Sequence, residues 1–154
     1  MRIWVDGDGA PLAVKDIVYR AAERRAIDTT IVANRLLAIP RHPRIKAVKV
    51  ERGFDVADDW LVANAVVGDL VVTSDVPLAA QLVAKGIAAI SFRGELFTPE
   101  NARSRLAARD LATEAREAGL VLGGGPPPFD ARAATAFANA FDRWLTAAQR
   151  RPSS

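Results

Sequence analysis

The sequence predicts an α/β fold, a three-layer α/β/α arrangement with a mostly parallel central sheet and additional C-terminal helices. Short apolar or β-branched runs alternate with amphipathic helical segments through residue 91, which is the pattern of βαβ units. The length of 154 residues is typical of one domain with a sizeable core. The apolar runs are too short for a transmembrane helix, so no membrane partner is expected.

Each element is predicted from its local pattern. Strands are expected where apolar or β-branched residues run together, and helices where apolar residues recur every three or four positions. Thr98 as N-cap and Pro99 at the first helical position begin one helix, and Gly86 ends another. The expected order is strand 2–5, helix 11–26, strand 29–33, loop 34–44, strand 45–50, helix 55–66, strand 70–73, helix 77–85, strand 87–91, helix 99–118 and helix 130–148.

These elements suggest one main domain and a C-terminal extension. An α/β domain is expected over residues 1–122, and the Gly-Gly-Gly-Pro-Pro-Pro run at 123–128 predicts a linker. Residues 129–149 are expected to form a helix that packs on the same domain, because Phe137, Phe141 and Leu145 share one stripe. Residues 150–154 are expected to be a disordered tail.

The composition narrows the classes of function. Without cysteine the chain has no disulfide and no thiolate metal site, and a single histidine leaves little room for imidazole-based zinc chemistry. Asp6 and Asp8 interrupt the N-terminus where a signal peptide needs an apolar segment, so a cytoplasmic location is expected. The net charge of +3 and the pI near 9.8 weakly favour a polyanionic partner. The oligomeric state is not predicted.

Carboxylates follow two of the expected strands. Asp6 and Asp8 come directly after the first strand, Asp75 follows the strand at 70–73, and Asp58 and Asp59 lie in the first turn of the helix at 55–66. Parallel strands place their carboxyl ends at one edge of the sheet, where α/β proteins bind ligands. Carboxylate and water oxygens are the ligands that Mg²⁺ and Mn²⁺ prefer. The pattern predicts a divalent metal site built from Asp6, Asp8, Asp58, Asp59 and Asp75.

Each acid also has a purely structural interpretation. Asp75 can cap the helix that follows it, Asp58 and Asp59 can complement a helix dipole, and Asp8 can hydrogen-bond the backbone of its own tight turn. Asp6 is the acid for which such a role is hardest to find. Agreement among several positions favours the metal site over these separate roles.

Basic residues cluster in the segment 34–52, where Glu51 is the one acid. Phosphodiester substrates need cations for the backbone and a metal for the scissile phosphate, so the cluster beside the predicted metal site favours a nucleic-acid partner, although most charge runs are simply solvated faces. The candidate nucleic-acid-binding residues, two of which lie outside this segment, are Arg35, Arg41, Arg44, Lys46, Lys49, Arg93 and Arg103.

Several motifs in order resemble the YaiI/YqxD family of bacterial proteins over nearly the whole chain. They are Asp6-Gly7-Asp8-Gly9-Ala10-Pro11, Val32-Ala33-Asn34, Gly53–Asp58, Gly68–Ala79, Arg93–Leu96 and Phe137–Leu145. The resemblance implies a relationship to PIN-like and NYN ribonucleases, with Asp6, Asp58 and Asp75 as the catalytic acids of metal-dependent RNA hydrolysis. The family usually has a cysteine where this chain has Ala10.

Two other functions remain open from the sequence. Asp6-Gly7-Asp8-Gly9 also resembles the opening motif of haloacid-dehalogenase phosphatases, in which Asp6 would be the nucleophile. The later acids of that class would have to be Asp69 and Asp75, which flank one strand and so lie far apart. The other alternative is a non-catalytic RNA-binding protein in which the acids hold metal only for structure.

Overall fold

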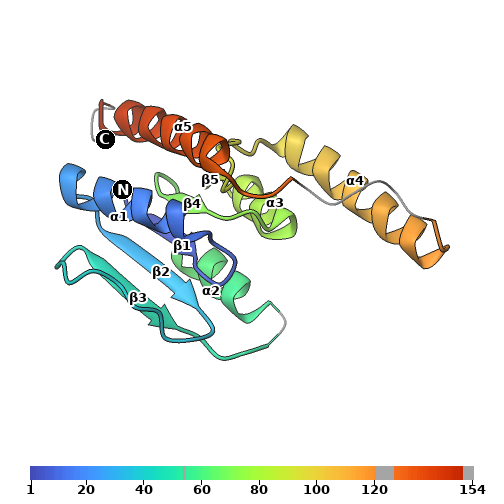
Figure 1. Ribbon diagram of the computed structural model, residues 1–154, viewed down its shortest axis with the longest axis horizontal. Coiled ribbons are helices and arrows are strands. Elements are labelled where there is room, and N and C mark those ends of the chain that lie inside the picture. Colours follow the sequence, from blue (N-terminus) through green and yellow to red (C-terminus); the bar gives the residue numbers. More distant parts are fainter. Residues whose placement is uncertain (54, 121–126, 151–154) are drawn as a thin grey trace.

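The computed structural model describes residues 1–53, 55–120 and 127–150. Its centre is a five-stranded sheet in the order β3-β2-β1-β4-β5 (Figure 1). The strands are β1 (Ile3–Asp6), β2 (Thr29–Ala33), β3 (Ile45–Lys49), β4 (Leu70–Val72) and β5 (Ala88–Ile90). Every neighbouring pair is parallel, so all five carboxyl ends lie at the same edge. This confirms the predicted fold class.

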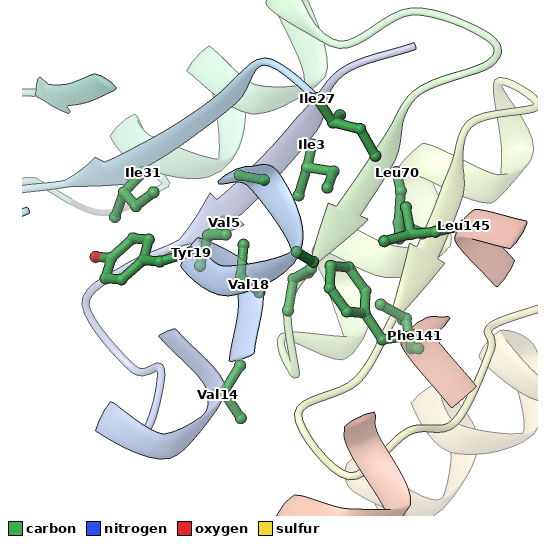
Figure 2. Packing of buried hydrophobic residues seen from close by; sticks show 14 of the residues in the cluster. Ile3, Val5, Val14, Val18, Tyr19, Ile27, Ile31, Leu70, Phe141 and Leu145 are labelled. Carbon is green, nitrogen blue, oxygen red and sulfur yellow. The ribbon is translucent and has the colours of Figure 1, made fainter. Parts of the chain in front are cut away.

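Helices cover both faces of the sheet because β1 is apolar on both sides. Ile3 and Val5 pack with α1 (Leu12–Arg25) and α5 (Ala131–Arg150), as Figure 2 shows. Trp4 points to the opposite face, where α2 (Val56–Asn64) and α3 (Val76–Ala84) pack. Helix α4 (Pro99–Glu117) contacts α3 at its start and then extends away from the sheet (Figure 1).

The expected helices and strands agree with the observed ones to within two residues at each end. One difference lies at the C-terminus, where α5 includes Arg150, the residue at which the sequence predicted a disordered tail to begin. Residues 123–126 of the predicted linker and 151–154 of the predicted tail lie outside the described residues. Among the described helices, none combines the length and the hydropathy needed to cross a membrane.

Asp69 holds the amino edge of the sheet together. It is 2% exposed, and its carboxylate accepts hydrogen bonds from the backbone N–H of Arg2 (2.9 Å), the indole N–H of Trp4 (3.0 Å) and the backbone N–H of Val66 (3.1 Å). These bonds join the start of β1 to the start of β4. Asp69 therefore lies at the opposite edge of the sheet from Asp6 and Asp75. The sequence predicted this separation, which counts against Asp69 and Asp75 as the paired acids of a phosphatase.

Candidate functional site

Three predicted acids meet at the carboxyl edge of the sheet. Asp6 is the last residue of β1, Asp75 follows the neighbouring strand β4, and Asp58 lies in the first turn of α2. All three are half-buried. Their convergence follows from the parallel topology, because β1 and β4 are adjacent and α2 contacts β1.

Thr73 connects two of these acids. Its side chain is fully buried, its hydroxyl donates a hydrogen bond to Asp6 Oδ2 over 2.9 Å, and the same oxygen accepts the backbone N–H of Asp75 over 3.1 Å. One hydroxyl thus fixes the orientation of the Asp6 carboxylate and the path of the chain at Asp75. Sequence reasoning did not select Thr73. The available signal was a hydroxyl residue directly after a buried strand and two positions before an acid.

The three carboxylates influence one another electrostatically. Burial raises the pKa of Asp6, the hydrogen bond from Thr73 partly opposes this, and the charges of Asp75 and Asp8 raise it further. The pKa of Asp58 is raised to about 6, first by burial and then by the charges of Asp75, Asp6, Asp55 and Asp59. Like charges held this close disfavour the ionised state unless a cation compensates them.

Close packing of the β1–α1 loop against β2 requires a glycine between Asp6 and Asp8. The N–H of Gly7 donates to Val32 O over 2.7 Å, and a Cβ at this position would lie 2.7 Å from Ile31 Cγ2. Only glycine fits so close to β2. Asp8 then lies at the surface, where its carboxylate accepts the backbone N–H of Asn34 over 2.8 Å. Asp8 therefore ties the acidic loop to the loop after β2.

Two other acids have structural positions. Asp75 is the N-cap of α3 and accepts the backbone N–H of Leu78 over 2.9 Å, so the helix-capping role holds together with its place beside Asp6. Asp59 is exposed on α2, whereas its neighbour Asp58 is half-buried and its pKa is raised by burial and by the charges of Asp75 and Asp6. The structure thus brings Asp6, Asp58 and Asp75 together, with Asp8 at their rim and Asp59 facing solvent.

The acids suit a hydrated divalent cation better than a fully coordinated one. In the part of the chain that the structure describes, no three His, Cys, Asp or Glu side chains are placed to bind one ion together. Mg²⁺ usually keeps several of its waters and takes only one or two carboxylates from the protein. Oxygen donors and a water-accessible edge fit such an ion, which one or two of Asp6, Asp58 and Asp75 would bind directly while the remaining carboxylate would contact its waters.

A family profile for the uncharacterized YaiI/YqxD family matches residues 4–147. The chain belongs to the YaiI/YqxD family. The chain is 49% identical over 145 residues to a UPF0178 protein of Cellvibrio japonicus, covering 94% of this chain and 96% of the relative. It is 51% identical over 148 residues to a UPF0178 protein of Bordetella parapertussis, covering 94% and 92%. No solved structure matches the chain.

In this member of the YaiI/YqxD family, Ala10 lies just before α1 and packs half-buried against the core. It supplies no group for catalysis or metal binding. The chain therefore has no thiol at this edge.

The predicted basic surface is divided between the two edges of the sheet. Arg35 and Lys49 line a groove of about 530 Å³ at the carboxyl edge, together with Arg52 and with Asn34, Leu36, Val50 and Glu51. Arg44 lies at the opposite, amino edge, where its guanidinium pairs with Asp28 over 3.2 Å. Arg41 is exposed in the segment that leads into β3, and Lys46 is exposed on β3 itself. The sequence did not distinguish these two groups.

The two remaining candidates lie outside this groove. The Arg93 guanidinium hydrogen-bonds Pro127 O and lies 5.7 Å above the ring of Phe129, so it braces the segment before α5. Arg103 is exposed on α4. Their role in RNA binding stays a prediction.

The raised pKa of Asp58 gives a stability prediction. Asp58 is protonated in both folded and unfolded protein below pH 3.8, and it ionises first in the unfolded chain as the pH rises towards about 6. Wild-type stability should therefore fall over this interval. We expect Asp58→Asn, measured by urea unfolding in EDTA, to flatten this decrease and to stabilise the protein by about 1 kcal/mol at pH 7 after allowance for solvent screening. A loss of stability at pH 7 would show that the Asp58 carboxylate makes a favourable contact instead.

Proposed function

We propose that this protein is a metal-dependent ribonuclease whose active site is the cluster of Asp6, Asp58 and Asp75. The observation that carries the proposal is the convergence of Asp6, Asp58 and Asp75 at the sheet edge, beside a basic groove, where burial and the charge of Asp75 raise the pKa of both Asp6 and Asp58. A bound cation would offset the repulsion among these carboxylates. The basic side chains of the groove would attract the phosphates of a nucleic-acid backbone.

Residues of the chain would divide the work of phosphodiester hydrolysis. Bound Mg²⁺ or Mn²⁺ supplies an activated water and offsets the charge that develops on the phosphate oxygens. Asp6, Asp58 and Asp75 would orient the hydrated ion, and Thr73 holds Asp6 in place through its 2.9 Å hydrogen bond. No protein nucleophile is required in this scheme.

The phosphatase alternative has less structural support. Its second acid would be Asp8, whose carboxylate accepts the N–H of Asn34, and Asp69 is buried at the far edge of the sheet. A non-catalytic RNA-binding protein is favoured by the basic groove alone, so hydrolysis is the property that separates the two.

The experiment that tests the proposal combines metal titration with RNA cleavage. Mg²⁺ and Mn²⁺ should each raise the unfolding temperature, and the free energy of unfolding should rise with the logarithm of the metal concentration, by about 2.7 kcal/mol at a hundredfold excess over Kd. RNA should be cleaved with either metal and remain intact in EDTA. RNA binding without cleavage would support the non-catalytic alternative, and hydrolysis of small phosphomonoesters through a phosphorylated Asp6 would support the phosphatase.

A further inference from the structure

The groove beside the acids is built at the ends of two strands. Asn34, Arg35 and Leu36 follow β2, and the residues from Lys49 to Arg52 end β3 and follow it. Since β2 is the immediate neighbour of β1, the groove begins one strand away from Asp6. The hydrogen bond from Asn34 to Asp8 joins its wall directly to the acidic loop. The groove and the acids are therefore parts of one continuous edge.

The charge of this groove suits a polyanion. Arg35, Lys49 and Arg52 contribute three cations against the single carboxylate of Glu51. All three basic side chains are exposed, and none takes part in an ion pair with any residue that the structure describes. By contrast, Arg44 at the opposite edge is paired with Asp28. The cations of the groove are therefore available to phosphate oxygens.

The spacing along the sheet edge relates the groove to the acids. Neighbouring strands lie about 4.8 Å apart, so the centre of the β2 and β3 ends is roughly 10 Å from the centre of the β1 and β4 ends. Successive phosphates of one strand are at least about 3.4 Å apart, so this distance corresponds to about one to three nucleotides. A phosphate in the groove and a phosphate at the acids would then belong to the same strand.

An exposed leucine in the groove favours an unpaired strand. Leu36 is 79% exposed and lies among the basic side chains. It offers an apolar surface to a base that has left its stack, which is a contact that single strands make and duplexes do not.

We infer that Arg35, Lys49 and Arg52 form a phosphate-binding subsite for a single-stranded RNA, one to three nucleotides from the bond cleaved at Asp6. This inference rests on the proposed function for the cleavage step, but the binding step can be measured without it. The preferred substrate is then an oligonucleotide that spans both places, and a dinucleotide is a poor substrate because it leaves the groove empty.

The binding test compares variants that remove three charges each. Fluorescence anisotropy of labelled oligo-uridine RNA is recorded against salt concentration in EDTA, where no cleavage is expected. The triple variant Arg35→Gln, Lys49→Gln, Arg52→Gln should bind at least about tenfold more weakly, and its slope of log affinity against log salt should be smaller by about 2, since each single-strand phosphate contact contributes about 0.7. A matched variant, Arg109→Gln, Arg116→Gln, Arg143→Gln, removes three charges from α4 and α5 and should keep the wild-type slope.

Other results would overturn the inference. If Arg41→Gln, Arg44→Gln, Lys46→Gln weakens binding as much as the groove variant does, the amino edge and β3 contribute equally and the groove is not the subsite. Equal affinity of wild type for duplex and single-stranded RNA would contradict the inference that the groove binds an unpaired strand. Equal affinity for single-stranded DNA and RNA would contradict a contribution of the 2′-hydroxyl to binding.

Cleavage measurements distinguish failure of the subsite inference from failure of the proposed ribonuclease function. With Mn²⁺ present, kcat/KM of wild type should rise from dinucleotide to longer RNA, the groove variant should lose this rise, and the matched α4 and α5 variant should keep it. Absence of cleavage with an intact groove effect on binding would reject the ribonuclease and retain the subsite. Cleavage with the same length dependence in both proteins would reject the subsite and retain the ribonuclease.

Discussion

Replacing Asp6 by Asn is expected to abolish metal-dependent RNA hydrolysis while the fold remains intact. The amide keeps the shape of the carboxylate and can still accept the hydrogen bond from Thr73, but it loses the charge that would hold the cation. A bound metal contributes several kcal/mol to the transition state, and each 1.4 kcal/mol is a factor of ten, so the rate should fall by about 10³-fold or more. Cleavage of labelled RNA in Mn²⁺ measures this loss.

The same variant should behave differently in stability measurements with and without metal. Burial and the charges of Asp75 and Asp8 raise the pKa of Asp6, so ionised Asp6 costs folding stability at neutral pH, and this cost disappears as the pH falls through its folded-state pKa. Asp6→Asn should therefore be as stable as wild type or more stable in EDTA, and it should lose the stabilisation that metal gives to wild type.

A matched control and an opposite outcome make this prediction decisive. Asp110→Asn changes an exposed acid on α4 and should alter neither cleavage nor the response to metal. If Asp6 were purely structural, Asp6→Asn would lose stability to the same extent with and without metal. Wild type would then show no Mn²⁺-dependent cleavage, and the proposed function would be wrong.

Local sequence patterns were sufficient to predict the order of strands and helices. Strand β1 is apolar on both faces and β2 is β-branched, so both could be identified without tertiary information. The acids at Asp6 and Asp75 could be placed at one edge because parallel strands share the direction of their carboxyl ends. These predictions depend on periodicity and topology, which a sequence contains directly.

Contacts between segments distant in sequence could not be predicted in the same way. The bond between Thr73 and Asp6 depends on the side-by-side pairing of β1 with β4, and the bond between Asp8 and Asn34 depends on the close approach allowed by Gly7. The basic residues between Arg35 and Arg52 are continuous in sequence, but β3 runs from one edge of the sheet to the other and separates them. Charge composition alone carries no information about this separation.

Thr73→Val is expected to lower cleavage by about 10- to 100-fold, the usual effect of removing a partner that orients a metal-binding carboxylate. Valine keeps the size of the buried side chain, but Asp6 loses a donor and the N–H of Asp75 loses an acceptor. Because the hydrogen bond from Thr73 lowers the pKa of Asp6, its removal should raise that pKa further. Protons then compete with metal at higher pH, so the acidic limb of the pH–rate profile should move to higher pH.

Two further variants separate positioning from packing. Thr73→Ser keeps the hydroxyl and should restore most of the activity and the original pH profile. Thr29→Val removes a buried hydroxyl at the amino end of β2, where Thr29 donates to Ile27 O over 3.1 Å, so it should reduce stability without moving the pH profile. If Thr73→Val and Thr29→Val reduce cleavage equally, with unchanged pH profiles, Thr73 contributes only to folding. A shift confined to Thr73→Val and reversed by serine would identify its hydroxyl as the group that positions Asp6, since a packing defect has no means of changing the ionisation of that carboxylate alone.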